Sequence, residues 1–132
     1  MAASPALVSL AGAGVHLGST TLFAGVDVAI GRGDKVALVG RNGSGKSTLM
    51  KCLAGQIEVD EGERFVQPGA RVAYLAQEPD FTGFATVADF VAAGQEDPRH
   101  YRVEQVLEAL NLPGDRICAT LSGGESRRAA IA

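Results

Sequence analysis

A glycine-rich stretch in the first half of the chain holds the residues best suited to chemistry. Residues 38–48 read LVGRNGSGKST, which places three glycines and a lysine directly after a short apolar run. Glycine lets a bulky ligand approach the backbone, and consecutive N–H groups of such a loop can point into one concavity that suits an anion. A simple turn would also use glycine. The stretch therefore predicts either a turn or a phosphate-binding loop.

The spacing within this stretch favours phosphate. Gly40, Gly45, Lys46 and Ser47 satisfy the pattern G-x-x-x-x-G-K-[ST], which needs a buried strand before it and a helix after it. We expect Lys46 to reach the β- and γ-phosphates of a nucleotide, and the Ser47 hydroxyl to complete the ligand shell of a Mg²⁺ ion. The candidate nucleotide-binding residues are Gly40, Arg41, Asn42, Gly43, Ser44, Gly45, Lys46, Ser47 and Thr48.

The segments around the loop predict the strand and the helix that this pattern requires. Val26–Ile30 alternates in polarity like a half-buried strand, and Lys35–Val39 is a continuous apolar run typical of a strand buried in a parallel sheet. Good helix formers follow in residues 47–54, and Gly55 stands where a helix would end. The expected order is strand, loop and helix.

The second half of the chain changes from strands to helices. Arg64–Val66 and Arg71–Leu75 flank a Pro-Gly turn and predict a hairpin or paired strands. Residues 86–110 show a helical pattern, and the segment NLPGDR that follows predicts its end. The apolar positions of this pattern are Val103, Val106, Leu107 and Leu110. We expect a last helix to begin near Ser122.

A second glycine motif lies at the start of that last helix. Residues 120–126 read TLSGGES, and Ser122 with Glu125 three residues later has the spacing of a capping box, which any helix can use. A capping box leaves the paired glycines Gly123 and Gly124 unexplained, because glycine costs stability in the first turn of a helix. The pair suggests close approach of a ligand.

This second motif resembles the LSGGQ-type signature of the ATP-binding-cassette (ABC) family, with Glu125 in place of the usual glutamine. Gln77, in the segment YLAQEP, would match the Q-loop glutamine of that family, although taken alone it reads as a solvent-facing loop residue. The resemblance implies that Lys46 and Gln77 are catalytic and that Ser47 and Gln77 bind Mg²⁺. The signature residues that it implies are Leu121, Ser122, Gly123, Gly124 and Glu125. They would contact ATP held by a second cassette in a head-to-tail pair.

The resemblance also implies a fold class. It predicts an α/β fold with a P-loop NTPase (RecA-like) core, an N-terminal antiparallel β part and a small helical subdomain. The expected division is 1–84 for the β-rich core, 85–120 for the helical subdomain and 121–132 for the signature. No apolar run ending in Asp-Glu follows the signature. We therefore expect a domain that is incomplete at its C-terminus and binds ATP and Mg²⁺ with hardly any hydrolysis.

The phrasing of two segments, residues 22–55 and 69–79, resembles the F subfamily of ABC proteins. Members of that subfamily carry two cassettes in one chain and commonly act on ribosomes. Three functions stay open at this stage. They are a cassette that couples ATP-driven closure to a ribosome or nucleic-acid partner, the ATPase subunit of a membrane transporter, and a truncated module that binds ATP without turnover.

One position departs from the family pattern. An aromatic side chain that stacks on adenine is expected within GVHLGSTTLF, where this chain has Leu17. The neighbouring His16 is an alternative stacking partner, although a lone histidine on a strand is more often a surface residue. The sequence leaves both stacking by His16 and weak apolar contact with adenine open.

Composition limits the partners that the chain can bind by charge alone. The formal net charge is −3, and no dense Lys/Arg cluster offers a footprint for nucleic acid or an anionic membrane. The apolar start has no basic residue before Arg32, so a secretory signal is not expected, and no run of about 18 apolar residues could span a bilayer. We expect a cytoplasmic chain in which Cys52 and Cys118 are free thiols.

Overall fold

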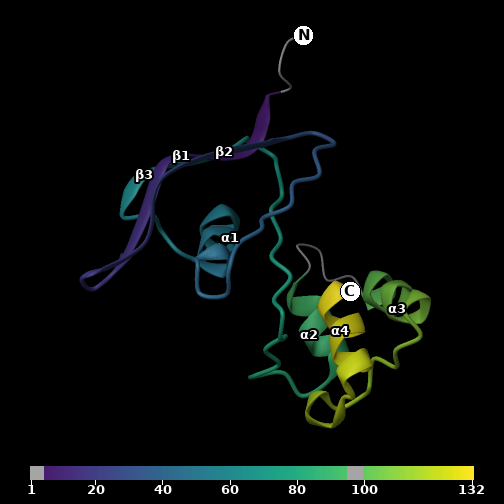
Figure 1. Cartoon of the computed structure of the whole chain (residues 1–132). Coiled ribbons are helices and arrows are strands. Elements are labelled where there is room, and N and C mark those ends of the chain that lie inside the picture. Colours follow the sequence, from purple (N-terminus) through teal and green to yellow (C-terminus); the bar gives the residue numbers. More distant parts are fainter. Residues whose placement is uncertain (1–4, 95–99) are drawn as a thin grey trace. The chain divides into compact units, whose positions relative to one another are not determined.

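The computed structural model describes residues 5–94 and 100–132. The chain divides into two compact units, one up to Tyr74 and one from Leu75. The first unit holds the strands and the phosphate loop, and the second holds the helices around the second glycine motif (Figure 1). The finer boundaries expected from the sequence stay predictions.

A three-stranded antiparallel sheet is the main regular structure described in the first unit. Its strands are β1 (Ala6–Leu17), β2 (Thr20–Gly31) and β3 (Glu61–Val66), in the spatial order β2-β1-β3. The predicted strand 26–30 lies within β2, so that prediction is confirmed. At Gly62, with φ of 80°, a Cβ would collide with the backbone of β1, so the pairing of β1 with β3 requires glycine there.

Helix α1 (Lys46–Ala54) packs against this sheet (Figure 1). Its Cys52 is buried together with Leu10, Ala13 and Val15 of β1. These small and branched side chains form the core of the first unit, so the helix that follows the phosphate loop is anchored to the sheet through its apolar face.

The end of α1 is fixed by its backbone and by β3. Gly55 ends the helix in the left-handed conformation, with φ of 79°, which confirms the predicted stop. Arg64 of β3 reaches the same end, where its Nε donates a hydrogen bond to the Leu53 carbonyl oxygen (2.9 Å). A carbonyl that the last turn leaves without a helical partner is thereby satisfied.

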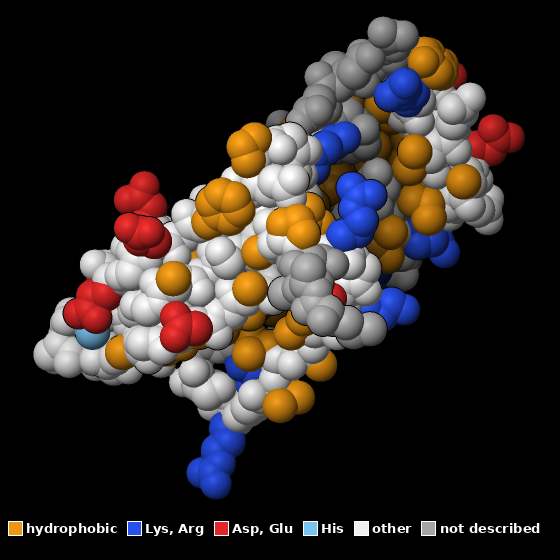
Figure 2. All heavy atoms as spheres, turned by 90° about the horizontal axis from the view of Figure 1, so that it is seen from above, with side chains coloured by type: hydrophobic (Ala, Val, Ile, Leu, Met, Phe, Trp, Pro, Cys, Tyr) orange, Lys and Arg blue, Asp and Glu red, His pale blue; other side chains and the backbone are white. Residues whose placement is uncertain are grey.

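Two predicted strands are not formed in the described part of the chain. Lys35–Val39 and Arg71–Leu75 have no regular structure, and Val39 is 86% exposed instead of buried. Figure 2 shows many hydrophobic side chains at the surface of the face it displays. The prediction is wrong for both segments because a strand exists through hydrogen bonds to a neighbour, and no described strand pairs with either segment. The turn before the second segment does form, since the Ala70 N–H donates to the Gln67 carbonyl (2.9 Å).

The described residues of the second unit contain three α-helices and a short 3₁₀ turn. They are α2 (Val87–Ala93), α3 (His100–Ala109), the 3₁₀ turn Cys118–Thr120 and α4 (Gly123–Ile131). The helical prediction for 86–110 is confirmed for α2 and α3, and its residues 95–99 lie outside the described range. The helix expected from Ser122 is confirmed as α4. No helix in the described ranges is long and apolar enough to cross a membrane.

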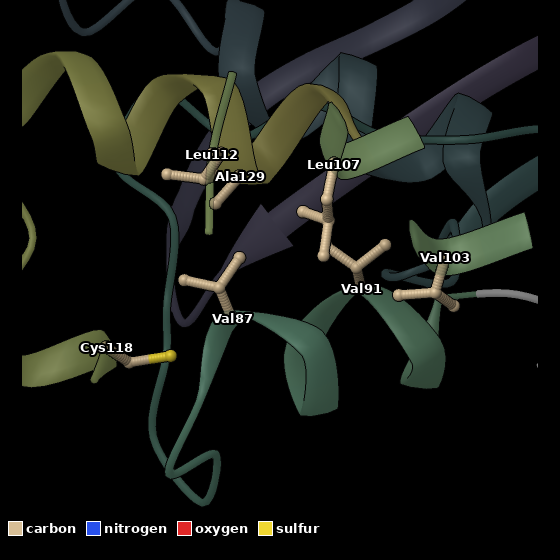
Figure 3. Packing of buried hydrophobic residues seen from close by; sticks show 7 residues of the cluster. All are labelled: Val87, Val91, Val103, Leu107, Leu112, Cys118 and Ala129. Atoms are coloured by element: carbon tan, nitrogen blue, oxygen red, sulfur yellow. The ribbon is translucent and has the colours of Figure 1, made fainter. Parts of the chain in front are cut away.

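Side chains from these helices pack into one core (Figure 3). Of the predicted apolar face of α3, Val103 and Leu107 are buried, and Val106 and Leu110 are half-buried. The buried members of the core are Val87, Val91, Val103, Leu107, Leu112, Cys118 and Ala129. Because α2, α3 and α4 all contribute, this core fixes the helix that carries the second glycine motif.

The loop after α3 turns back at an asparagine. Asn111 adopts a φ of 50°, and the Leu112 N–H donates to the Leu107 carbonyl oxygen (2.9 Å). The predicted end of the helix is confirmed, but the residue that ends it is Asn111. The Pro-Gly pair comes later, directly after Leu112.

Candidate nucleotide-binding site

The phosphate loop folds as a tight turn in which Gly40 and Gly45 lie close to neighbouring atoms. A Cβ at Gly40 would lie 2.8 Å from the Ser44 Oγ, and one at Gly45, with φ of 88°, would lie 3.1 Å from the Leu22 carbonyl oxygen. The Ser44 N–H donates to the Arg41 carbonyl (3.1 Å) and closes the turn. The folded chain itself therefore requires glycine at position 45, whereas a side chain at position 40 would require the Ser44 side chain to move.

Lys46 folds over this turn. Its Nζ donates hydrogen bonds to the carbonyl oxygens of Gly40 (2.5 Å) and Arg41 (2.7 Å). An ammonium group has three donors, so one remains for an anion in the loop. The two bonds hold the positive charge beside the loop, where a phosphate would need it.

The N-terminus of α1 provides further donors. Gly45 is the N-cap, so no side chain in the described residues caps this helix, and its first turn holds no acidic residue. The first N–H groups and the partial positive charge of α1 are therefore available to an anion. Ser47, the candidate Mg²⁺ ligand, is exposed in this turn, and Thr48 is half-buried.

Gln77 lies in the second unit, in a segment without regular secondary structure, and is exposed. It lines a hollow of about 350 Å³ together with Pro79 and with Arg127 and Ile131 of α4. The structure thus brings Gln77 beside the helix that carries the second glycine motif, while the phosphate loop belongs to the first unit. The role of Gln77 at Mg²⁺ stays a prediction.

Ser122 and Glu125 form a complete capping box at the start of α4. The Ser122 Oγ accepts the Glu125 N–H (3.3 Å), and the Glu125 Oε2 accepts the Ser122 N–H (2.8 Å). Arg116, which the sequence analysis missed because no local spacing links it to α4, places its Nη2 3.3 Å from the Glu125 Oε1. The hydrogen bond from the Ser122 backbone, helped by Arg116, lowers the pKa of Glu125. The capping-box interpretation is confirmed, and Glu125 is ionised at neutral pH.

The two glycines beside the capping box have no structural requirement in the second unit. Neither Gly123 nor Gly124 has a positive φ, and a Cβ at either would meet no described atom within 4 Å outside its own helical turn and chain neighbours. A glycine inside a helix costs roughly 1 kcal/mol relative to alanine. Packing and backbone conformation therefore leave this pair unexplained.

His16 is fixed by polar contacts at both ring nitrogens. Its Nδ1 lies 3.0 Å from the Thr21 Oγ1, and its Nε2 lies 3.5 Å from the Glu61 Oε1. Leu17 beside it is 71% exposed. These contacts are those of a satisfied surface histidine, and stacking of His16 on adenine stays a prediction.

Comparison with a family model gives the class of protein. A model described as ABC transporter matches residues 23–132, a range that includes the phosphate loop, Gln77 and the second glycine motif. The chain therefore belongs to the ABC family, and the resemblance seen in the sequence is confirmed at that level.

The individual relatives include an ATP-binding protein and an import ATP-binding protein. The ATP-binding protein Uup of Caulobacter vibrioides is 50% identical over 116 residues, which cover 87% of this chain and 19% of that protein. The aliphatic sulfonates import ATP-binding protein SsuB 2 of Burkholderia cenocepacia is 36% identical over 98% of this chain and 52% of its own length. The chain thus spans about a fifth of the first relative and about half of the second.

Solved structures confirm the fold class. The ATP-binding subunit of an ABC transporter matches with a TM-score of 0.77 at 24% identity, over 95% of this chain and 60% of that one. The ATP-binding cassette MJ0796, solved as a dimer bound to ADP and Pi, matches with a TM-score of 0.76 at 20% identity, over 94% of this chain and 67% of that one. The predicted P-loop NTPase fold, with an antiparallel β part and helices, is correct.

Proposed function

We propose that this chain is the ATP-binding part of an ABC cassette. The observation that carries the proposal is the position of the Lys46 side chain. Two loop carbonyls hold its ammonium group beside a helix N-terminus that has no side-chain cap. The remaining donor of Lys46 and the loop N–H groups would bind the β- and γ-phosphates, and Ser47 would complete the shell of Mg²⁺. ATP and Mg²⁺ are thus the proposed cofactors.

The second glycine motif would act on a nucleotide bound by another cassette. The open space at Gly123 and Gly124 supports this role, because a phosphate held by a partner could approach the helix backbone closely there. Ser122 and Gly124 would touch the γ-phosphate, and Gln77 would contact Mg²⁺ and the attacking water. The partner in this proposal is a second cassette arranged head to tail.

The polypeptide 1–132 should bind ATP with hardly any turnover. Phosphoryl transfer needs a group that orients the attacking water, and the sequence has no apolar run ending in Asp-Glu after residue 126. Steady hydrolysis by the pure chain that disappears in Lys46→Ala would contradict this proposal.

For the whole protein we propose a cytoplasmic ABC ATPase of the F subfamily that couples ATP-driven closure to the ribosome. The relative at 50% identity supports this choice over a transporter subunit, for which the sulfonate-import relative at 36% is the support. Sedimentation of the full-length product with ribosomes in the presence of a non-hydrolysable ATP analogue separates the two. Recovery with a membrane-embedded subunit instead would favour the transporter.

The ATP-binding proposal is tested by Lys46→Ala. We expect about a 10- to 100-fold rise in the dissociation constant for Mg-ATP, since a charge-assisted hydrogen bond to phosphate is lost. Calorimetric titration measures it, with Lys51→Ala as the matched control, because Lys51 lies in the last turn of the same helix. An unchanged dissociation constant in a folded Lys46→Ala variant would overturn the proposal.

A further inference from the structure

An open groove of about 670 Å³ runs along the second unit and shares no lining residue with either glycine motif or with Gln77. It is formed by the start of α2, one side of α3 and the loop that follows α3. Its lining is mostly apolar and includes Ala88, Leu107 and Leu112. Figure 3 shows that Leu107 and Leu112 also belong to the core, so the floor of the groove is the outer side of a packed cluster.

One wall of this groove includes a glycine, Gly114, that is closely packed against both helices. A Cβ at Gly114 would lie 3.1 Å from the Leu107 Cδ1 and 3.3 Å from the Ala88 Cβ. At Gly114 the loop after α3 therefore packs closely on both helices, with no side chain of its own at that position. The hollow is built by the backbone and by buried side chains, which suits a surface that is formed before a ligand arrives.

The rim of the groove is acidic. Glu104 and Glu108, one helical turn apart on α3, and Asp115 on the loop all line it and are exposed. The described lining contains no lysine or arginine. Arg116, next in the chain, has its guanidinium 3.3 Å from Glu125 of α4. The groove thus joins an apolar floor to a negative rim.

We propose that this groove binds a basic amphipathic segment of a protein partner. Apolar side chains of such a segment would cover the floor, and its lysine and arginine side chains would pair with the Glu108 and Asp115 carboxylates of the rim. Nucleic acid is the wrong ligand for this surface, because its phosphates would face the same carboxylates. This role goes beyond ATP binding, because the groove would attach the cassette to a protein that carries such a segment.

The test uses the full chain and a short fluorescent peptide of leucine and lysine patterned as an amphipathic helix. Fluorescence anisotropy at low salt should show binding, and the double variant Glu108→Gln, Asp115→Asn should weaken it about fivefold to tenfold, as expected for two exposed ion pairs. The double variant Glu58→Gln, Glu63→Gln removes the same charge from the first unit and should leave the affinity unchanged. Circular dichroism checks that all variants are folded.

Peptide controls separate charge from apolar contact. Replacing leucine by serine, or lysine by glutamate, should each abolish binding, because the groove needs both features. Absence of binding, equal loss in both double variants, or an RNA oligonucleotide that binds and is lost with the groove variant would overturn the proposal. A groove variant that changes the oligomeric state of the chain would assign the surface to a second copy instead. Lys46→Ala should leave peptide binding intact, so failure here is distinguishable from failure of ATP binding.

Discussion

The two glycine-marked helix starts of this chain, those of α1 and α4, look alike in sequence and differ in structure. At α1 the N-cap is Gly45, no described side chain caps the helix, and its first turn holds no carboxylate. At α4 the cap is Ser122, and the Glu125 carboxylate already accepts a hydrogen bond from the Ser122 N–H. The first end is therefore free of a side-chain cap, as a helix start that binds an anion needs to be. The second is satisfied by its own chain, so a ligand there must add to an existing cap.

The glycines of the two starts also have opposite roles. Gly45 has a positive φ and close neighbours, so the fold needs it. Gly124 has neither, so the fold is weakened by it. Glycine is therefore a structural requirement in the first motif and lowers the stability of the helix in the second. Substitution by alanine should have opposite effects on stability in the two motifs.

The largest effect is expected for Gly45→Ala. An alanine at φ of 88° is strained, and its Cβ would press on the Leu22 carbonyl oxygen at 3.1 Å. We expect a loss of about 1–3 kcal/mol in the free energy of unfolding and weaker binding of Mg-ATP. Urea denaturation and calorimetric titration measure the two effects.

Gly43→Ala is the matched control for that variant. Gly43 also has a positive φ, of 79°, but a Cβ there would meet nothing within 4 Å. It should show the backbone strain alone and a smaller loss of stability. Equal losses in the two variants would mean that the contact between the loop and β2 contributes nothing to the free energy of unfolding.

A smaller effect of opposite sign is expected for Gly124→Ala. Alanine favours the helix, and its Cβ would enter open space, so the free energy of unfolding should rise by about 0.5–1 kcal/mol. Gly123→Ala should behave similarly. Under the proposed function, the same change in the full-length protein should weaken ATP-dependent pairing of cassettes, because the added methyl group would obstruct the approach of the γ-phosphate to Gly124. Stabilisation of the chain with unimpaired pairing would remove the case for a ligand at this helix start.

The helices predicted correctly from the sequence are those with local causes. Helix α1 and helix α4 follow from caps, glycine stops and residues three or four apart, all of which the sequence displays directly. Lys35–Val39 failed because its strand structure depends on a neighbouring strand that no local pattern reveals. The close approach of β3 to β1 at Gly62 is equally invisible in the sequence, since it depends on a pairing across the fold.

The candidate site likewise has features that the sequence predicts and features that it does not. The turn of the phosphate loop and the start of α1 could be predicted, because one short pattern indicates a loop followed by a helix. The return of Lys46 to the loop carbonyls and the contact of Arg116 with Glu125 could not, because both depend on side-chain placement. Arg116 matters most here, since it shows that the Glu125 charge is matched by the protein itself.

The smallest effect sharpens the comparison through pH. The pKa of Glu125 is lowered in the folded chain, chiefly by the hydrogen bond from the Ser122 backbone, so ionised Glu125 stabilises the fold at pH values above its unfolded pKa. This contribution should be lost as the pH falls through the folded pKa. Glu125→Gln keeps an acceptor for the Ser122 N–H but cannot titrate, so its unfolding free energy should fall less on acidification. Arg116→Gln should change the pH dependence less than Glu125→Gln, since Arg116 is a weaker cause of the shift than the hydrogen bonds to Ser122. If the unfolding free energies of the wild type and Glu125→Gln changed in parallel with pH, ionised Glu125 would not contribute to the stability of the α4 start. The contrast with the open end of α1 would then rest on Ser122 alone.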